Sequence, residues 1–121
     1  MDWDSCRALD TSSLGRLGED WAVAFLKTRG FPILGRNLVL DPGEIDILAR
    51  IDGERTVVEV RSTRARRDAT WPPAQAFSAF DYRKAQQVRR VARFHGCRRV
   101  DVITVRFHEH GVDLHWVPRA A

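Results

Sequence analysis

The chain has 121 residues, of which 44% are hydrophobic and 30% charged, a composition that is typical of one globular domain and excludes a largely disordered protein. It contains no apolar run of membrane-spanning length and no signal-like start, so we expect a cytoplasmic protein without a membrane partner. The 20 basic and 16 acidic residues give a net charge of +4, and eighteen of the basic residues are arginine. Arginine suits phosphate oxygens and favours a nucleic-acid partner, although GC-rich coding would produce the same enrichment.

Apolar periodicity and turn signals predict an α/β domain with the element order α-β-β-β-α-β-β. Residues 1–12 are expected to form a flexible N-terminal arm, followed by a single domain over residues 13–121. The expected elements are a helix from Ser12 or Ser13 to Gly30, a strand over 31–40, two strands over 44–51 and 54–62, a basic loop over 63–73, a helix from Ser78 to His95, a strand over 99–107 and an edge strand over 113–117. This order predicts a mixed β-sheet flanked by helices.

The hairpin predicted over the second and third strands places two carboxylates opposite each other. With a two-residue turn at Asp52-Gly53, the numbers of opposed residues have a constant sum, so Asp46 faces Glu59 and Glu44 faces Arg61 on the same side of the sheet. Opposed carboxylates repel unless a cation lies between them or one of them takes a proton. Two interpretations remain open, a hard divalent cation such as Mg²⁺ between the acids, or a solvent-exposed polar face that Arg61 partly neutralises.

Two further charged residues lie on faces of helices that are otherwise apolar. Glu19 falls inside the rim of the apolar arc of the first helix, and Lys84 lies on the stripe formed by Phe80, Val88 and Val91. Each could be a side chain that snorkels from the edge of the core. Their coincidence with the acidic hairpin favours a shared polar site.

Five segments carry a resemblance to a known family. They are LGRLGEDWAVAFLKTRGFPILGRN, GEIDILA, VVEVR, the lysine-bearing second helix and RRVDVITV, and they cover roughly residues 14–107. Together they resemble the small bacterial YraN-like family of predicted endonucleases, which is similar in pattern to the PD-(D/E)xK nucleases. The resemblance implies a restriction-endonuclease-like fold with an acid on one strand, Glu-x-Lys on the next strand, and Mg²⁺ or Mn²⁺ between them.

The resemblance also implies a role for each hairpin residue. Asp46 would be the first acid and Glu59 the second, and both would bind the metal together with the backbone carbonyl of Val60. Arg61 occupies the position of the family's lysine. Because arginine is always protonated, Arg61 cannot be a general base, but it would hold a phosphate electrostatically.

The implied function is that of a metal-dependent endonuclease that hydrolyses phosphodiester bonds in DNA, including branched or structured DNA, with DNA favoured over RNA. Glu19 matches the first-helix glutamate of such folds, and Lys84 would supply a further cation. Small nucleases of this kind often act as dimers, so a homodimer is implied by analogy. The alternatives are a catalytically inactive nucleic-acid-binding module on the same fold, and a protein-interaction role in which the basic loop contacts an acidic partner.

The basic loop is a second candidate interface. Arg64, Arg66 and Arg67 lie near Trp71, and they would grip a nucleic-acid backbone while the tryptophan stacks on a base. A solvated loop whose tryptophan covers the core fits the same pattern.

Overall fold

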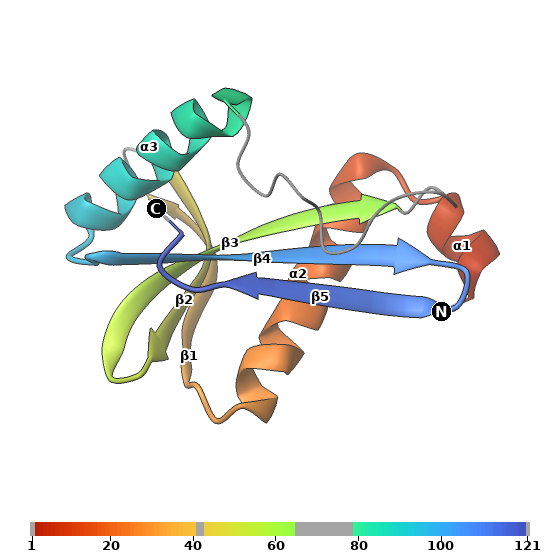
Figure 1. Ribbon diagram of the computed structural model, residues 1–121, viewed down its shortest axis with the longest axis horizontal. Coiled ribbons are helices and arrows are strands. Elements are labelled where there is room, and N and C mark those ends of the chain that lie inside the picture. Colours follow the sequence, from red (N-terminus) through yellow and green to blue (C-terminus); the bar gives the residue numbers. More distant parts are fainter. Residues whose placement is uncertain (1, 41–42, 65–78, 121) are drawn as a thin grey trace.

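A five-stranded mixed sheet lies between helices in the computed structural model, which describes residues 2–40, 43–64 and 79–120 (Figure 1). Its elements are α1 (Trp3–Arg7), α2 (Thr11–Thr28), β1 (Ile33–Leu40), β2 (Gly43–Ile51), β3 (Glu54–Arg64), α3 (Ala79–Phe94), β4 (Arg99–His108) and β5 (Gly111–Val117). The strand order is β1-β2-β3-β4-β5, and the pairing is antiparallel except between β3 and β4. The expected α/β architecture is confirmed, with α1 as an additional element.

The helix ends follow from local capping. The Asp10 side chain accepts a hydrogen bond of 2.7 Å from the Ser13 backbone N–H, so α2 begins at Thr11, slightly earlier than expected. Gly30 and Gly96 follow α2 and α3 with φ of +82° and +76°, a left-handed conformation that favours glycine and ends a helix. Both glycine stops were expected from the sequence, whereas the expected cap of α3 lies outside the described residues.

The N-terminal residues include a short helix, α1. The Asp2 side chain caps α1 by accepting a hydrogen bond of 2.7 Å from the Ser5 backbone N–H. Cys6 is only 5% exposed and belongs to the main hydrophobic core. A five-residue helix has little stability of its own, so burial of its apolar side holds it against the domain.

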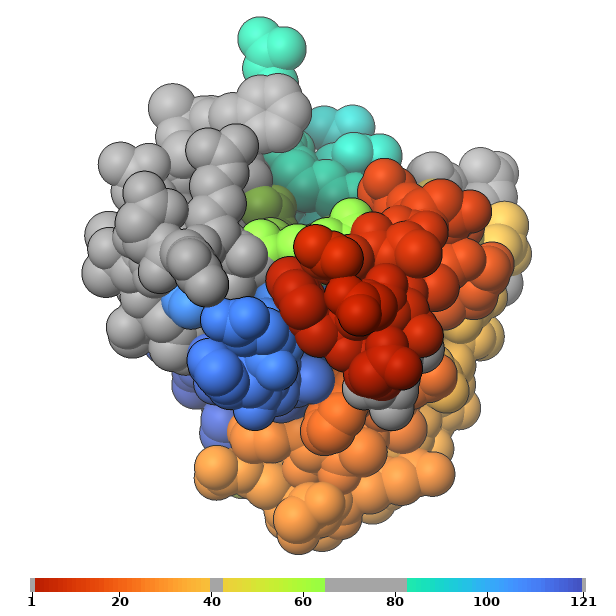
Figure 2. All heavy atoms as spheres, turned by 90° about the vertical axis from the view of Figure 1, so that its right-hand side faces the viewer, coloured from red at the N-terminus to blue at the C-terminus, as the bar shows by residue number. Residues whose placement is uncertain are grey.

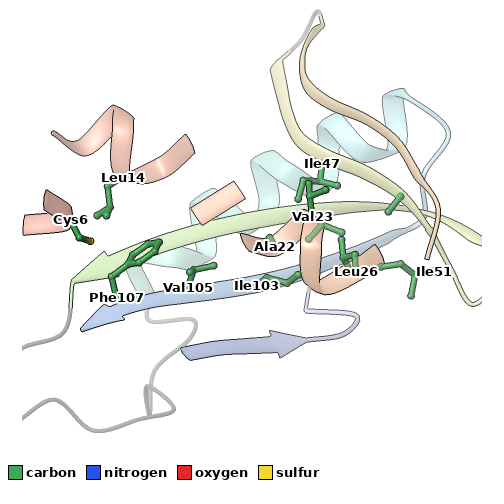
Figure 3. Close-up of a cluster of buried hydrophobic side chains, with 12 residues drawn as sticks. Cys6, Leu14, Ala22, Val23, Leu26, Ile47, Ile51, Ile103, Val105 and Phe107 are labelled. Carbon is green, nitrogen blue, oxygen red and sulfur yellow. The ribbon is translucent and has the colours of Figure 1, made fainter. Parts of the chain in front are cut away.

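Each face of the sheet carries one hydrophobic cluster. On one face, Ala22, Val23 and Leu26 of α2 point toward Ile47 and Ile103 of the sheet (Figure 3). This cluster also extends to α1 and the end of β4. Together with the cluster under α3, this packing fixes the position of the sheet from both sides.

The second cluster lies under α3. Val88, Val91 and Ala92 of α3 pack there with Leu48 of β2 and Val57 of β3. Across the described residues, no helix is long and apolar enough to cross a membrane.

Candidate active site

The hairpin of β2 and β3 opens at one end. Asp52 and Gly53 have φ of 53° and 82°, which forms the tight turn expected for Asp-Gly. The expected register is confirmed from Ile51↔Glu54 to Ile47↔Val58, where the ladder between the two strands ends. Beyond this point, within the described residues, β2 pairs with β1 alone and β3 with β4 alone.

This separation corrects part of the sequence prediction. Asp46 and Glu59 would be the next pair in the ladder, and Glu44 would later face Arg61, yet neither pair is part of the ladder. The Asp46 carboxylate lies between the diverging strands, where its Oδ2 accepts a hydrogen bond of 2.9 Å from the Val60 backbone N–H. A side-chain oxygen therefore takes a position that a backbone carbonyl would fill in a continued ladder.

The packing around Asp46 is consistent with this geometry. Ile45 packs in the cluster under α3, whereas Ile47 packs in the cluster under α2. Residues two apart on a regular strand share a face, so the alternation of side chains breaks at Asp46. The break directs Asp46 toward β3.

Asp46 and Glu59 nevertheless interact through their side chains. The Glu59 side chain is 13% exposed. The pKa of Glu59 is raised to about 7. Burial is the largest cause, and the charge of Asp46 and a hydrogen bond with its carboxyl act in the same direction. The charges of Lys84 and Arg61 oppose the rise. The arrangement keeps Glu59 partly protonated near neutral pH.

Glu19 adds a third carboxyl group to the site. It is 8% exposed, and its Oε1 is buried without a hydrogen-bond partner among the described residues. Burial raises the pKa of Glu19, and the charge of Asp46 raises it further, whereas Arg36 lowers it. Glu19 therefore lies near Asp46, although no three His, Cys, Asp or Glu side chains in the described part of the chain are close enough to hold a metal ion by themselves.

Cations approach the acids from the side of α3. The Lys84 Nζ lies 3.6 Å from the Glu59 Oε1, and the lysine side chain is 49% exposed. Glu59, Arg61 and Lys84 line a gap of about 10 Å³ under α3, which has room for about one water molecule. Viewed from the end where β3 terminates, yellow-green atoms of β3 are recessed between α3 and the red-orange residues of α1 and early α2 (Figure 2).

Of the basic-loop residues expected to bind nucleic acid, the structure describes Arg64. The Arg64 guanidinium donates hydrogen bonds to the backbone carbonyls of Cys6 and Leu9. Arg64 therefore ties β3 to the N-terminal segment and does not present a free guanidinium to a ligand. Arg66, Arg67 and Trp71 lie outside the described residues.

Gly18 is a site residue that the sequence reasoning missed. A Cβ atom at Gly18 would lie 1.8 Å from the Ser62 Oγ, so α2 crosses β3 closely at this point. The crossing sets the distance between the sheet and the neighbouring Glu19. A glycine in a helix interior is the signal that could have identified it.

Comparison with known proteins identifies relatives that all belong to one family. The model of the uncharacterised protein family UPF0102 matches residues 18–105. A UPF0102 protein of Geobacter metallireducens is 32% identical over 118 residues, which cover 93% of this chain and 95% of that relative. UPF0102 proteins of Aquifex aeolicus and Pelobacter propionicus are 51% and 41% identical over 49 and 76 residues, which cover 40% and 62% of this chain. These matches span about half of each of the latter two relatives, 48% and 54%.

Proposed function

Because this chain belongs to the uncharacterised protein family UPF0102, the YraN-like family that its sequence resembles, we propose that it is a metal-dependent endonuclease. Its substrate is DNA, including branched or structured DNA, and its reaction is hydrolysis of a phosphodiester bond. Its cofactor is Mg²⁺ or Mn²⁺. The homodimer implied by the resemblance stays a prediction.

The observation that carries the proposal is the acid pair at the point where β2 and β3 separate. Asp46 uses its Oδ2 to bind the Val60 backbone N–H, which leaves its Oδ1 for another partner. Glu59 lies beside it with a pKa raised to about 7 by burial and by Asp46. Two carboxylates held together against their repulsion are hard oxygen donors of the kind that Mg²⁺ and Mn²⁺ prefer.

A ligand set follows from these positions. Asp46 and Glu59 would hold the ion, together with the backbone carbonyl of Val60. When bound, the ion would polarise the scissile phosphate and lower the pKa of a water molecule. The buried Glu19 Oε1, which has no hydrogen-bond partner among the described residues, would accept a hydrogen bond from a water molecule and orient it.

The cations have an electrostatic role in this proposal. Arg61 and Lys84 line the gap beside Glu59, and Lys84 reaches to 3.6 Å from its carboxylate. Negative charge grows on the phosphate oxygens during the reaction, and cations fixed nearby stabilise it. Arg61 fills this role without acting as a base, since its guanidinium stays protonated.

The first prediction tests the metal and the chemistry together. Mg²⁺ or Mn²⁺ should raise the melting temperature of the wild-type protein, and Asp46→Asn should abolish that rise because it removes one of two anionic ligands. On a panel of duplex, flap, four-way-junction and RNA substrates with Mn²⁺, Asp46→Asn and Glu59→Gln should each lower cleavage by at least about 100-fold.

The matched control for this experiment is Asp113→Asn. Asp113 lies on β5 and pairs with His108, away from the acid pair. Its replacement should leave both the metal-induced stabilisation and the cleavage rate unchanged. Equal stabilisation of wild type and Asp46→Asn by the metal, or undiminished cleavage by the Glu59 variant, would refute the proposal.

One observation favours a second candidate function, a catalytically inactive module that binds nucleic acid. The Lys84 Nζ already lies 3.6 Å from the Glu59 Oε1, so a protein cation stands beside one of the acids without a metal. Arginine also stands at position 61, where nucleases of this type carry lysine. Salt-sensitive DNA binding without cleavage and without stabilisation by metal would support the module.

A further inference from the structure

The net charge of the protein is concentrated on one element. The segment that forms α3 contains five of the 20 basic residues and one of the 16 acidic residues. The rest of the chain contains fifteen residues of each sign, so the formal net charge of +4 equals that of α3 alone. Composition alone did not reveal this concentration, because it averages over the whole chain.

The arginines of α3 face away from the sheet. Val88, Val91 and Ala92 bury the inner side of the helix. The outer side of the helix carries four exposed arginines, which we call the arginine ridge: Arg83, Arg89, Arg90 and Arg93.

Part of the ridge is hollowed. Gln86, Arg90 and Arg93 line an open depression of about 250 Å³ on the outer side of α3. Arg90 and Arg93 are three residues apart on the helix, so their side chains are neighbours and repel each other. This repulsion would be relieved by an anion bound between them.

The ridge differs from the arginines elsewhere in the molecule, several of which are neutralised by carboxylates. Such pairs are Arg7–Asp4 at 2.9 Å, Arg36–Asp20 at 2.7 Å, Arg99–Asp101 at 2.8 Å and Arg119–Glu54 at 2.8 Å. Within the described residues, no carboxylate lies within ion-pairing distance of a ridge arginine. The ridge therefore has four cations available for a partner outside this part of the chain.

The ridge also begins at the candidate active site. Arg83 is the neighbour of Lys84, whose Nζ contacts Glu59. From Arg83 to Arg93 the helix rises about 15 Å, a length that covers about four phosphates of one DNA strand. Guanidinium groups bind phosphate oxygens through two parallel hydrogen bonds, and the ridge contains no lysine.

We propose that the arginine ridge binds the phosphate backbone of DNA that extends beyond the acid site along α3. This inference rests on the proposed function, because it takes DNA as the substrate of the same site. The ridge fixes where the strand runs, while the acids act on one phosphodiester bond. It contributes affinity and position, and it carries no sequence specificity.

The experiment compares two double variants with the same loss of charge. Arg90→Gln with Arg93→Gln removes half of the ridge, and Arg50→Gln with Arg55→Gln removes two exposed arginines that pair across the β2–β3 hairpin. Glutamine has nearly the helix propensity of arginine, and circular dichroism checks that α3 stays folded. Binding of a labelled DNA duplex is measured by fluorescence anisotropy in EDTA over a series of NaCl concentrations.

The ridge variant should bind the duplex roughly 10- to 100-fold more weakly, and its slope of log affinity against log salt should be shallower by about 1.8. The hairpin variant should keep the wild-type slope. Equal weakening of both variants would assign the effect to net charge, and a wild-type slope in the ridge variant would leave the ridge without a DNA role. Either result overturns the proposal.

Two further arms separate the outcomes. In one arm, poly-glutamate replaces the duplex. If poly-glutamate binds the wild-type protein as tightly as the duplex does, and the ridge variant loses as much affinity for it, the partner is an acidic protein and the proposal fails. Binding in EDTA requires no cleavage, so the ridge can be supported even if the nuclease proposal fails. Conversely, cleavage that depends on Asp46 but not on the ridge would leave the proposed function intact.

Discussion

At Glu59, two effects act in the same direction on one proton. Burial disfavours the carboxylate, and the Asp46 carboxyl beside it disfavours a second negative charge, so the pKa of Glu59 rises from 4.5 to about 7. Lys84 and Arg61 act in the opposite direction but do not cancel the rise. Keeping the two acids together therefore lowers the stability of the folded protein, which is typical of a functional site.

The second prediction follows from this pKa in metal-free protein. Between about pH 4.5 and about pH 7 the folded state binds more protons at Glu59 than the unfolded state, so stability falls as pH rises through this window. Glu59→Gln removes the titrating group. Its free energy of unfolding should exceed that of wild type above about pH 7, by up to about 3 kcal/mol, and the difference should shrink toward about pH 4.5.

Urea denaturation in EDTA at several pH values measures this difference. Glu109→Gln is the control, because Glu109 lies in the β4–β5 turn and its carboxylate is 3.4 Å from the exposed His110. Its effect on the free energy of unfolding should stay small at every pH. A pH-independent difference for Glu59→Gln would contradict the assigned pKa.

At the scale of elements, local signals predicted most of the fold. The glycines after α2 and α3 and the Asp52-Gly53 turn set element ends through backbone conformations that neighbouring residues decide. The hairpin register followed from the turn and held over the five pairs nearest to it. These features depend on short stretches of sequence, so a pattern can identify them.

Other features depend on distant partners and escaped prediction. The ladder of β2 and β3 ends where the Asp46 side chain binds the Val60 backbone N–H, a competition that no local pattern encodes. The hydrogen bonds of Arg64 were not predicted, since its partner carbonyls belong to residues 58 and 55 positions earlier in the chain. The same separation hid α1, whose stability comes from packing of Cys6 on the core.

The crossing of α2 over β3 leads to the third prediction. Gly18→Ala would place a Cβ 1.8 Å from the Ser62 Oγ and 3.0 Å from the Ser62 Cβ, so the helix or the serine must move. This overpacking should cost about 1–3 kcal/mol of unfolding free energy, as measured by urea denaturation. Gly15→Ala is the matched control on the same helix, because its Cβ would meet nothing within 4 Å and should stabilise α2 by up to about 1 kcal/mol.

A double variant isolates the contact. The Ser62 Oγ is buried without a hydrogen-bond partner among the described residues, so Ser62→Ala alone should cost little. Combined with Gly18→Ala, it removes the closest clash, and the two effects should deviate from additivity by at least about 1 kcal/mol. Additive effects would show that the crossing is looser than the structure indicates.

At the scale of the whole molecule, the candidate site draws its side chains from α2, β2, β3 and α3. Pattern and resemblance together pointed to these four residues, Asp46 and Glu59 through the register of the hairpin, and Glu19 and Lys84 as charged residues on otherwise apolar helix faces. The sheet must be held rigidly for these groups to stay in place. A second set of buried charges, on β4 beside the residue that precedes Glu59, contributes to this rigidity.

Asp101 on β4 is the centre of that set. It is fully buried and accepts hydrogen bonds from Arg99 at 2.8 and 3.0 Å, from the Trp116 indole at 2.9 Å and from the Arg119 backbone N–H at 3.0 Å. These bonds join β4 to β5 and to the C-terminal segment. The pKa of Arg99 is raised by its hydrogen bonds to Asp101, which means that the pair favours the charged state of the guanidinium.

The fourth prediction concerns this network. Asp101→Asn keeps the shape but removes the charge, so the Arg99 side chain, 3% exposed, would lose its main partner and keep the longer contacts to Asp52 at 3.4 Å and Glu54 at 3.7 Å. Removing one partner of a buried ion pair is strongly unfavourable, and the free energy of unfolding should fall by about 3–5 kcal/mol in urea denaturation. Asp4→Asn breaks an exposed ion pair with Arg7 and should cost less than about 1 kcal/mol.

The network prediction has its own internal check. A loss of this size is a large share of the roughly 5–15 kcal/mol that stabilises a small domain, so Asp101→Asn alone risks partial unfolding. Adding Arg99→Leu removes the stranded cation and should recover part of the loss, because an apolar side chain is tolerated where an unpaired charge is not. If Arg99→Leu lowers the free energy of unfolding as much in the Asp101→Asn background as it does in the wild-type protein, the two residues do not act as a pair. The rigidity of the sheet must then have another source.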